Sequence, residues 1–319
     1  MDSDDYPGPR IVGRGGRGTG GWVWVAPGIG QPLPEDRSDK PSHRQHDSAT
    51  NENGSDSAVL FEEATAPPSE GEPSSPLPEE TPADHGVRVN VIGPLEIESW
   101  VDPPTRHKVT EALCFLALHR KRPMTMEELQ IALSSDGDDA PETSAKSVRT
   151  YMSELRRSLG AEHVPSARGS GYRLADSVST DWDVFRSLVA LRPTEFDDQV
   201  QALIDALNLV RGRPFAGTDY AWVNSELLVS EMEVAISDAA RRLGKIAMAS
   251  KRNLEGIAYF AGRRAALACP YDIGLWEMAM EAAAAFDHDE LVRTWREAQA
   301  TLGEDPTALR DLAERLGLD

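Results

Sequence analysis

Residues 144–160 read SAKSVRTYMSELRRSLG and form the most informative stretch of the sequence. Its apolar residues recur at spacings of three and four, which places them on one face of a helix. These residues are Ala145, Val148, Met152, Leu155 and Leu159. The opposite face carries polar and cationic side chains, namely Lys146, Arg149, Thr150, Ser153, Arg156 and Arg157. The pattern predicts an amphipathic helix with one buried stripe and one cationic stripe, ended by the glycine at position 160.

The preceding segments predict a small sheet and two more helices. Valines alternate with polar residues over 87–91, a Gly-Pro turn follows, and the alternation resumes over 95–97. This predicts two short antiparallel strands. Helical spacing appears over 109–117, and a second helix is expected after Thr125, which forms a capping box with Glu128.

The segment that follows the amphipathic helix predicts a β-hairpin. Short strand-like runs at 164–167 and 172–174 flank a glycine-rich turn that contains Arg168. A small sheet, three helices and a hairpin with an arginine at its tip, in this order, predict a winged helix-turn-helix domain.

Three stretches resemble the OmpR/PhoB-type winged helix, and more closely the version in actinobacterial antibiotic-regulatory-protein (SARP) activators. They are VIGPLE at 91–96, RTYMSELRR at 149–157 and GYRL at 171–174. In that family the third helix enters the major groove and the wing approaches the DNA backbone or minor groove. The resemblance implies DNA contacts by Lys146, Arg149, Thr150, Ser153, Arg156, Arg157 and Arg168. The chain departs from the family at Glu154, where relatives usually have a basic residue, and at Ser134, where they have an aromatic one.

The chain from Asp181 onward predicts helices only. The expected long helices span 222–248, 254–268, 273–286, 289–302 and 307–316. Paired helices with short breaks are typical of a tetratricopeptide-like repeat. This half resembles the bacterial transcriptional activator domain (BTAD) that follows the winged helix in SARP regulators, most clearly at ALNLVRGRPF, residues 206–215.

Composition divides the chain into three parts. Residues 1–86 carry a net charge of −10, are rich in Pro, Gly and Ser, and lack apolar periodicity, which predicts a disordered acidic tail. A winged-helix domain over 87–176 and a helical-repeat domain over 177–319 complete a mainly α fold. The whole chain has a net charge of −20, yet residues 144–173 hold six Lys or Arg against two Glu. This basic island is where nucleic acid would bind.

Other classes of protein fit the sequence poorly. No apolar run approaches the roughly 18 residues of a spanning helix, and the N-terminus lacks a signal peptide, so we expect a cytoplasmic protein. The histidines are scattered, and motifs for zinc binding, phosphate binding or nucleophilic hydrolysis do not occur. We therefore expect neither an enzyme nor a cofactor. Cys114 and Cys269 lie in apolar stretches and are expected to be buried thiols.

Two functional hypotheses remain. In the first, the protein is a transcriptional regulator that binds double-stranded DNA, and its helical repeats mediate homodimer formation or contact RNA polymerase. In the second, it is an adaptor whose winged helix has lost DNA binding and whose helical repeats bind a protein partner. The cationic face favours the first hypothesis. Glu154 and the acidic tail and helical half favour the second.

Overall fold

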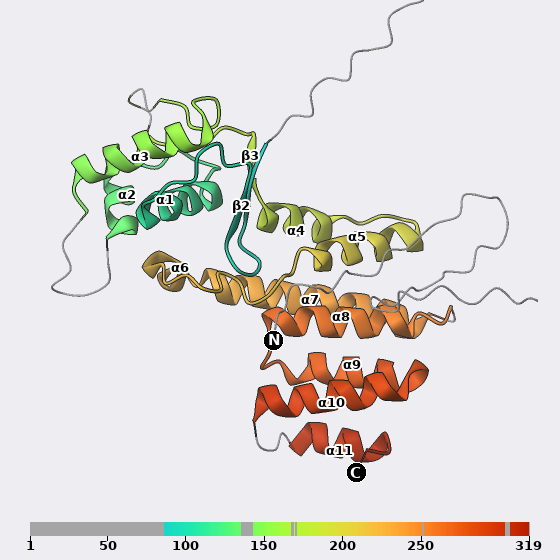
Figure 1. The fold of residues 1–319 in the computed structure, drawn as a ribbon. Helices are drawn as coiled ribbons and strands as arrows, with labels where there is room; N and C mark the ends of the chain where they lie inside the picture. Colours follow the sequence, from blue (N-terminus) through green and yellow to red (C-terminus); the bar gives the residue numbers. More distant parts are fainter. Residues whose placement is uncertain are drawn as a thin grey trace, which may run out of the picture. The chain divides into compact units, whose positions relative to one another are not determined.

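The computed structural model describes residues 86–134, 143–166, 169, 171–250, 252–303 and 307–318 (Figure 1). Almost all of the expected acidic tail, 1–86, lies outside the described residues, and so does Arg168 at the expected tip of the wing. Within the described part of the chain, no helix is both long enough and apolar enough to cross a membrane.

A three-stranded sheet with the order β2-β1-β3 opens the described chain. Strand β1 (Val87–Asn90) runs antiparallel to β2 (Glu96–Glu98), with Val89 opposite Ile97, which confirms the two predicted strands. Strand β3 (Val178–Thr180) lies parallel to the other edge of β1. The sequence pattern did not predict β3, because its residues Val178–Thr180 include a single apolar side chain and so show no alternation.

Three helices complete the N-terminal part, α1 (His107–Leu118), α2 (Met126–Leu133) and α3 (Ala145–Leu159). Most residues of α1 are buried, and both α2 and α3 pack on this helix. The predicted capping box at the start of α2 is present. Thr125 Oγ1 accepts from the Glu128 N–H at 3.1 Å, and Glu128 Oε2 accepts from the Thr125 N–H at 2.7 Å.

The segment after α3 differs from the predicted β-hairpin. The described residues show no strand pairing between 164–166 and 172–174. Tyr172 instead pairs with Met124 in the α1–α2 connection, where two backbone hydrogen bonds of 2.7 Å join the two residues. The backbones approach closely because Gly171 has φ +89°, and a Cβ at this position would lie 2.7 Å from the Met124 carbonyl oxygen. A local strand pattern could not predict this pairing, because Met124 and Tyr172 are far apart in the sequence.

From Asp181 onward the described chain is helical, as predicted. The helices are α4 (Asp181–Ala190), α5 (Phe196–Asn208), α6 (Ala221–Ser225), α7 (Leu228–Ala249), α8 (Glu255–Ala268), α9 (Ile273–Phe286), α10 (His288–Leu302) and α11 (Thr307–Arg315). Helix α8 packs between α7 and α9, and α9 packs on α10, so that sequential helices are also neighbours in space (Figure 1). This arrangement is typical of a helical repeat.

The single long helix expected over 222–248 is two helices, α6 and α7. Leu227 separates them, because it adopts the left-handed conformation with φ +55°. Its N–H donates to the Asn224 carbonyl at 3.1 Å, which closes α6. The apolar spacing continues across this break, so a periodicity argument could not detect it.

The end of β1 is held by segments from the helical half. The buried Asp181 carboxylate, at the start of α4, accepts hydrogen bonds from the N–H groups of Val91 at 2.8 Å and Ile92 at 2.9 Å. The Arg211 N–H donates to the Ile92 carbonyl at 2.8 Å, and the Phe215 N–H donates to the Val91 carbonyl at 2.9 Å. The sheet of the winged helix and the helical half are therefore joined by backbone hydrogen bonds.

Both cysteines are unpaired and buried, as predicted. Burial raises the pKa of the Cys114 thiol well above its usual range, and it raises the pKa of Cys269 to about 12. A thiol with a raised pKa is a poor nucleophile at neutral pH, which fits a packing role for both residues.

Candidate nucleic-acid interface

The start of α3 is anchored to the end of α2. The Ser144 hydroxyl caps the helix by accepting from the Ser147 N–H at 3.1 Å. One residue earlier, the Thr143 hydroxyl donates to the Leu133 carbonyl at 2.8 Å, and the Gln130 side-chain amide donates to the Thr143 carbonyl at 2.9 Å. These bonds fix the position at which α3 begins relative to α2.

The inward face of α3 sets its rotation. Val148, Met152, Leu155 and Leu159 are buried, as the spacing predicted, while Ala145 is half-buried. Gly160 ends the helix with φ +104°, and its N–H donates to the Arg156 carbonyl at 2.9 Å. With one face committed to the core, the remaining side chains of α3 have to point away from it.

The outward face of α3 is cationic and exposed. Its exposed members are Lys146, Arg149, Thr150, Ser153 and Arg157. Within the described part of the chain, the three cationic side chains form no ion pair, so their charges face solvent. The two hydroxyls donate to carbonyls one turn earlier, Thr150 to Lys146 at 3.0 Å and Ser153 to Arg149 at 2.8 Å. Their oxygens remain able to accept hydrogen bonds.

Arg156 differs from its neighbours, because its guanidinium is already engaged. Its Nε donates to the Val164 carbonyl at 2.8 Å, and one Nη donates to the Pro165 carbonyl at 2.9 Å. The side chain is half-buried and holds the first part of the wing against α3. The structure therefore gives Arg156 a structural contact, and its DNA contact stays a prediction, as does that of Arg168.

Glu154 follows the exposed Ser153 in the sequence, but its own side chain is mostly covered. Its side chain is only 11% exposed, and its Oε2 lies 3.6 Å from an Nη of Arg106. Arg106 is the residue immediately before α1, and its side chain is 56% exposed. Arg106 could not be identified from the sequence, because no local pattern connects residues that are 48 positions apart.

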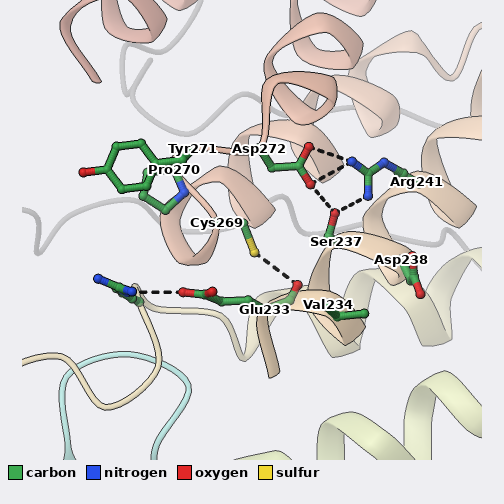
Figure 2. Close-up of a pocket in the computed structure, with 10 residues that line it drawn as sticks. Glu233, Val234, Ser237, Asp238, Arg241, Cys269, Pro270, Tyr271 and Asp272 are labelled. Atoms are coloured by element: carbon green, nitrogen blue, oxygen red, sulfur yellow. Dashed lines mark hydrogen bonds and ion pairs between the residues drawn. The ribbon is translucent and has the colours of Figure 1, made fainter. Parts of the chain in front are cut away.

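A hollow lies on the helical half, beside α7 and the α8–α9 connection (Figure 2). Its volume is about 360 Å³. One Nη atom of Arg241 donates to both carboxylate oxygens of Asp272, at 2.6 and 2.7 Å, so the charges of these two residues offset each other. The lining also holds the Arg213–Glu233 pair, the exposed carboxylate of Asp238, and the side chains of Val234, which is 62% exposed, and Tyr271, which is 73% exposed.

Metal binding receives no support from the described residues, among which no group of three or more His, Cys, Asp and Glu side chains is placed to hold an ion. The described residues thus include a cationic face on α3 and a hollow beside α7 that is lined by both charged and apolar side chains.

A comparison with protein families finds a match over residues 104–174 to the family described as transcriptional regulatory protein, C terminal. The matched segment contains α1, α2, α3 and the residues that follow them up to Leu174. The chain therefore carries a winged helix of the OmpR/PhoB type. The matched segment contains the cationic face of α3.

A comparison with solved structures finds Mycobacterium tuberculosis EmbR in complex with a low-affinity phosphopeptide, with 22% sequence identity and a TM-score of 0.45. The match covers 72% of this chain and 64% of that chain, so the present chain spans less than two thirds of the EmbR structure. No curated protein matches the sequence.

Proposed function

We propose that the protein is a transcriptional regulator that binds double-stranded DNA by placing α3 in the major groove. The observation that carries the proposal is the exposed trio Lys146, Arg149 and Arg157 on a helix whose opposite face is buried. A major groove about 12 Å wide accepts a helix with its side chains, whose diameter is about 10–12 Å. The resemblance to the OmpR/PhoB-type family supports the proposal, because in that family the third helix enters the major groove.

The residues of α3 have different roles in this proposal. Arg149 and Ser153 lie on the middle of the exposed face and would contact base edges, since arginine forms bidentate hydrogen bonds with guanine. Lys146 and Arg157 lie toward the two ends of the helix and would contact phosphates, together with Arg168 of the wing. Phosphate contacts position the protein, and base contacts select the sequence.

The proposed role of the helical half is protein–protein contact. Its order of helices and the resemblance of 206–215 to a BTAD support a SARP-type regulator, in which α4–α11 mediate homodimer formation or contact RNA polymerase. Under this proposal the domains are those expected from the sequence, 87–176 and 177–319, and the protein acts in the cytoplasm, where bacterial DNA is found.

The test is a DNA-binding titration of the full chain with a pool of random-sequence duplexes, over a range of salt concentrations. Replacing Arg157 by alanine should lower the slope of log affinity against log salt by about 0.9, the value for one lost phosphate contact. Replacing Arg149 should leave this non-specific binding largely intact. On a preferred site, selected by repeated capture and sequencing, it should cost about 1–3 kcal/mol.

The matched control is Arg315→Ala, which removes the same charge from the exposed end of α11. This variant should bind DNA as the unmodified chain does. If Lys146→Ala, Arg149→Ala and Arg157→Ala all retain DNA as well as the control at low salt, α3 is not a recognition helix and the proposal fails.

The second candidate function is that of an adaptor without DNA binding. The apolar side chains of Val234 and Tyr271, exposed beside the hollow of Figure 2, are the observation that favours it. Exposed apolar groups next to a surface hollow are a common feature of protein-binding sites. A chain that retains no DNA at low salt would support this function and refute the first.

A further inference from the structure

The proposed DNA-binding helix carries one acidic residue, Glu154, directly after Ser153 in the sequence. A carboxylate free to point toward the DNA would repel the phosphates and weaken the field of the neighbouring arginines. In the structure this carboxylate does not point freely into solvent. It lies in a mostly covered position, 3.6 Å from the Arg106 guanidinium.

Arg106 is held in place by the segment that carries it. The β2–α1 connection is attached to the C-terminal end of α3, because the N–H groups of Val101 and Asp102 both donate to the Ser158 carbonyl, at 3.0 and 3.3 Å. At the other end of this connection, the Arg106 carbonyl accepts from the Val109 N–H at 2.9 Å, in the first turn of α1. Hydrogen bonds therefore hold the backbone before Arg106 and at Arg106, and the guanidinium lies beside Glu154 of α3.

Stability alone is a weak reason for this ion pair. More than half of the Arg106 side chain is exposed, and ion pairs in contact with water contribute little to the free energy of unfolding. The position of the pair, next to the exposed residues of α3, matters more. An arginine from outside the helix offsets the one negative charge on it.

We propose that Arg106 is a positioning residue for DNA binding, which neutralises Glu154 and holds its carboxylate away from the phosphates. The inference rests on the proposed function, since it requires α3 to dock on DNA. It also explains how a helix with an acid at this position can serve as a recognition helix. In this mechanism Arg106 acts through Glu154, and its own contact with a phosphate is not required.

The test is a double-mutant cycle on the full chain, with Arg106→Ala, Glu154→Gln and the combined variant. Binding to the pool of random-sequence duplexes is measured at low salt, where charge effects are largest. Arg106→Ala alone should weaken binding roughly three- to tenfold, because it leaves an unpaired carboxylate near the phosphates. The same replacement in the Glu154→Gln background should weaken binding less than about twofold. Glu154→Gln alone should bind as well as, or better than, the unmodified chain.

Two further variants separate the explanations. Arg106→Lys keeps the positive charge and should retain most of the affinity, while Arg315→Ala should show no coupling with Glu154→Gln. Thermal unfolding of each variant establishes that the fold is intact.

If Arg106→Ala lowers the affinity for DNA equally in the unmodified chain and in the Glu154→Gln variant, the inference is overturned. Arg106 would then contact DNA by itself. This outcome leaves the proposed function standing. If the unmodified chain retains no DNA at all, the proposed function and the inference both fail.

Discussion

Replacing Asp181 by alanine should destabilise the whole chain, because this carboxylate joins the two halves of the described structure. Asp181 is 1% exposed and accepts hydrogen bonds from the backbone N–H groups of Val91 and Ile92. Alanine removes both acceptors and leaves two buried donors without a partner. The Arg211 guanidinium, 3.7 Å from the same carboxylate, loses its contact with this group as well.

The magnitude follows from the two orphaned donors and one offsetting effect. Each buried N–H group without a partner costs about 1–3 kcal/mol, so the two together cost about 2–6 kcal/mol. Burial raises the pKa of Asp181 despite its hydrogen bonds and the nearby Arg211, which means that ionised Asp181 itself carries a desolvation penalty. Alanine relieves this penalty, so we expect a net loss of about 1–4 kcal/mol in the free energy of unfolding.

The raised pKa also fixes the sign of the pH dependence. Between the unfolded-state value of about 3.9 and the higher folded-state value, the folded chain binds more protons than the unfolded chain. The stability that Asp181 contributes therefore falls as pH rises through this window, and it is constant above it. The difference in the free energy of unfolding between the unmodified chain and Asp181→Ala should therefore become smaller as pH rises through this window.

Urea unfolding of the full chain, followed by tryptophan fluorescence at several pH values, measures both quantities. The free energy of unfolding of Asp181→Asn should fall between those of the unmodified chain and Asp181→Ala. Its carboxamide oxygen can accept a hydrogen bond from one of the N–H groups, while its NH2 faces the other. The control is Asp238→Ala, since Asp238 is exposed on α7. A loss below about 1 kcal/mol for Asp181→Ala, or a difference that widens as pH rises through the window, would refute this reasoning.

Three shorter predictions concern local structure. The Arg122 side chain and the capping box lower the pKa of Glu128 to about 2. Ionised Glu128 therefore contributes stability that is lost as pH falls from about 4.3 toward 2, and Glu128→Gln should remove this contribution. In acid titrations the unmodified chain should be more stable than Glu128→Gln above this window, and the two stabilities should converge within it. Gly93→Ala should lower the midpoint of thermal unfolding, because φ is +145° and the new Cβ would lie 2.8 Å from Arg211 Cβ; an unchanged midpoint would contradict this. Leu227→Gly should raise the midpoint by relieving a left-handed conformation that costs leucine about 1–2 kcal/mol, and a lower midpoint would show that its side chain contributes more than the strain costs.

The features that were predictable from sequence depend on residues close together in the chain. The stripe of α3 requires only a 3.6-residue period, and the capping box of Thr125 requires only a residue three positions later. For the same reason the cationic face of α3 could be located before the structure was known. Local periodicity determines which side of a helix is apolar, and so the opposite side as well.

The features that could not be predicted from the sequence are contacts between segments that are far apart in the chain. Strand β3 pairs with β1 across 91 positions, and Tyr172 pairs with Met124 rather than with a hairpin partner. Within the candidate site, the carbonyls of the wing engage Arg156, and Arg106 pairs with Glu154.

The local sequence was therefore enough to predict the two faces of α3. Which charges on its outer face are engaged, as that of Arg156 is, depends on segments that are distant in the sequence. The physical reason is that a helix period is an interaction between near neighbours, while an ion pair or a buried backbone hydrogen bond forms wherever distant segments are brought within about 3–4 Å.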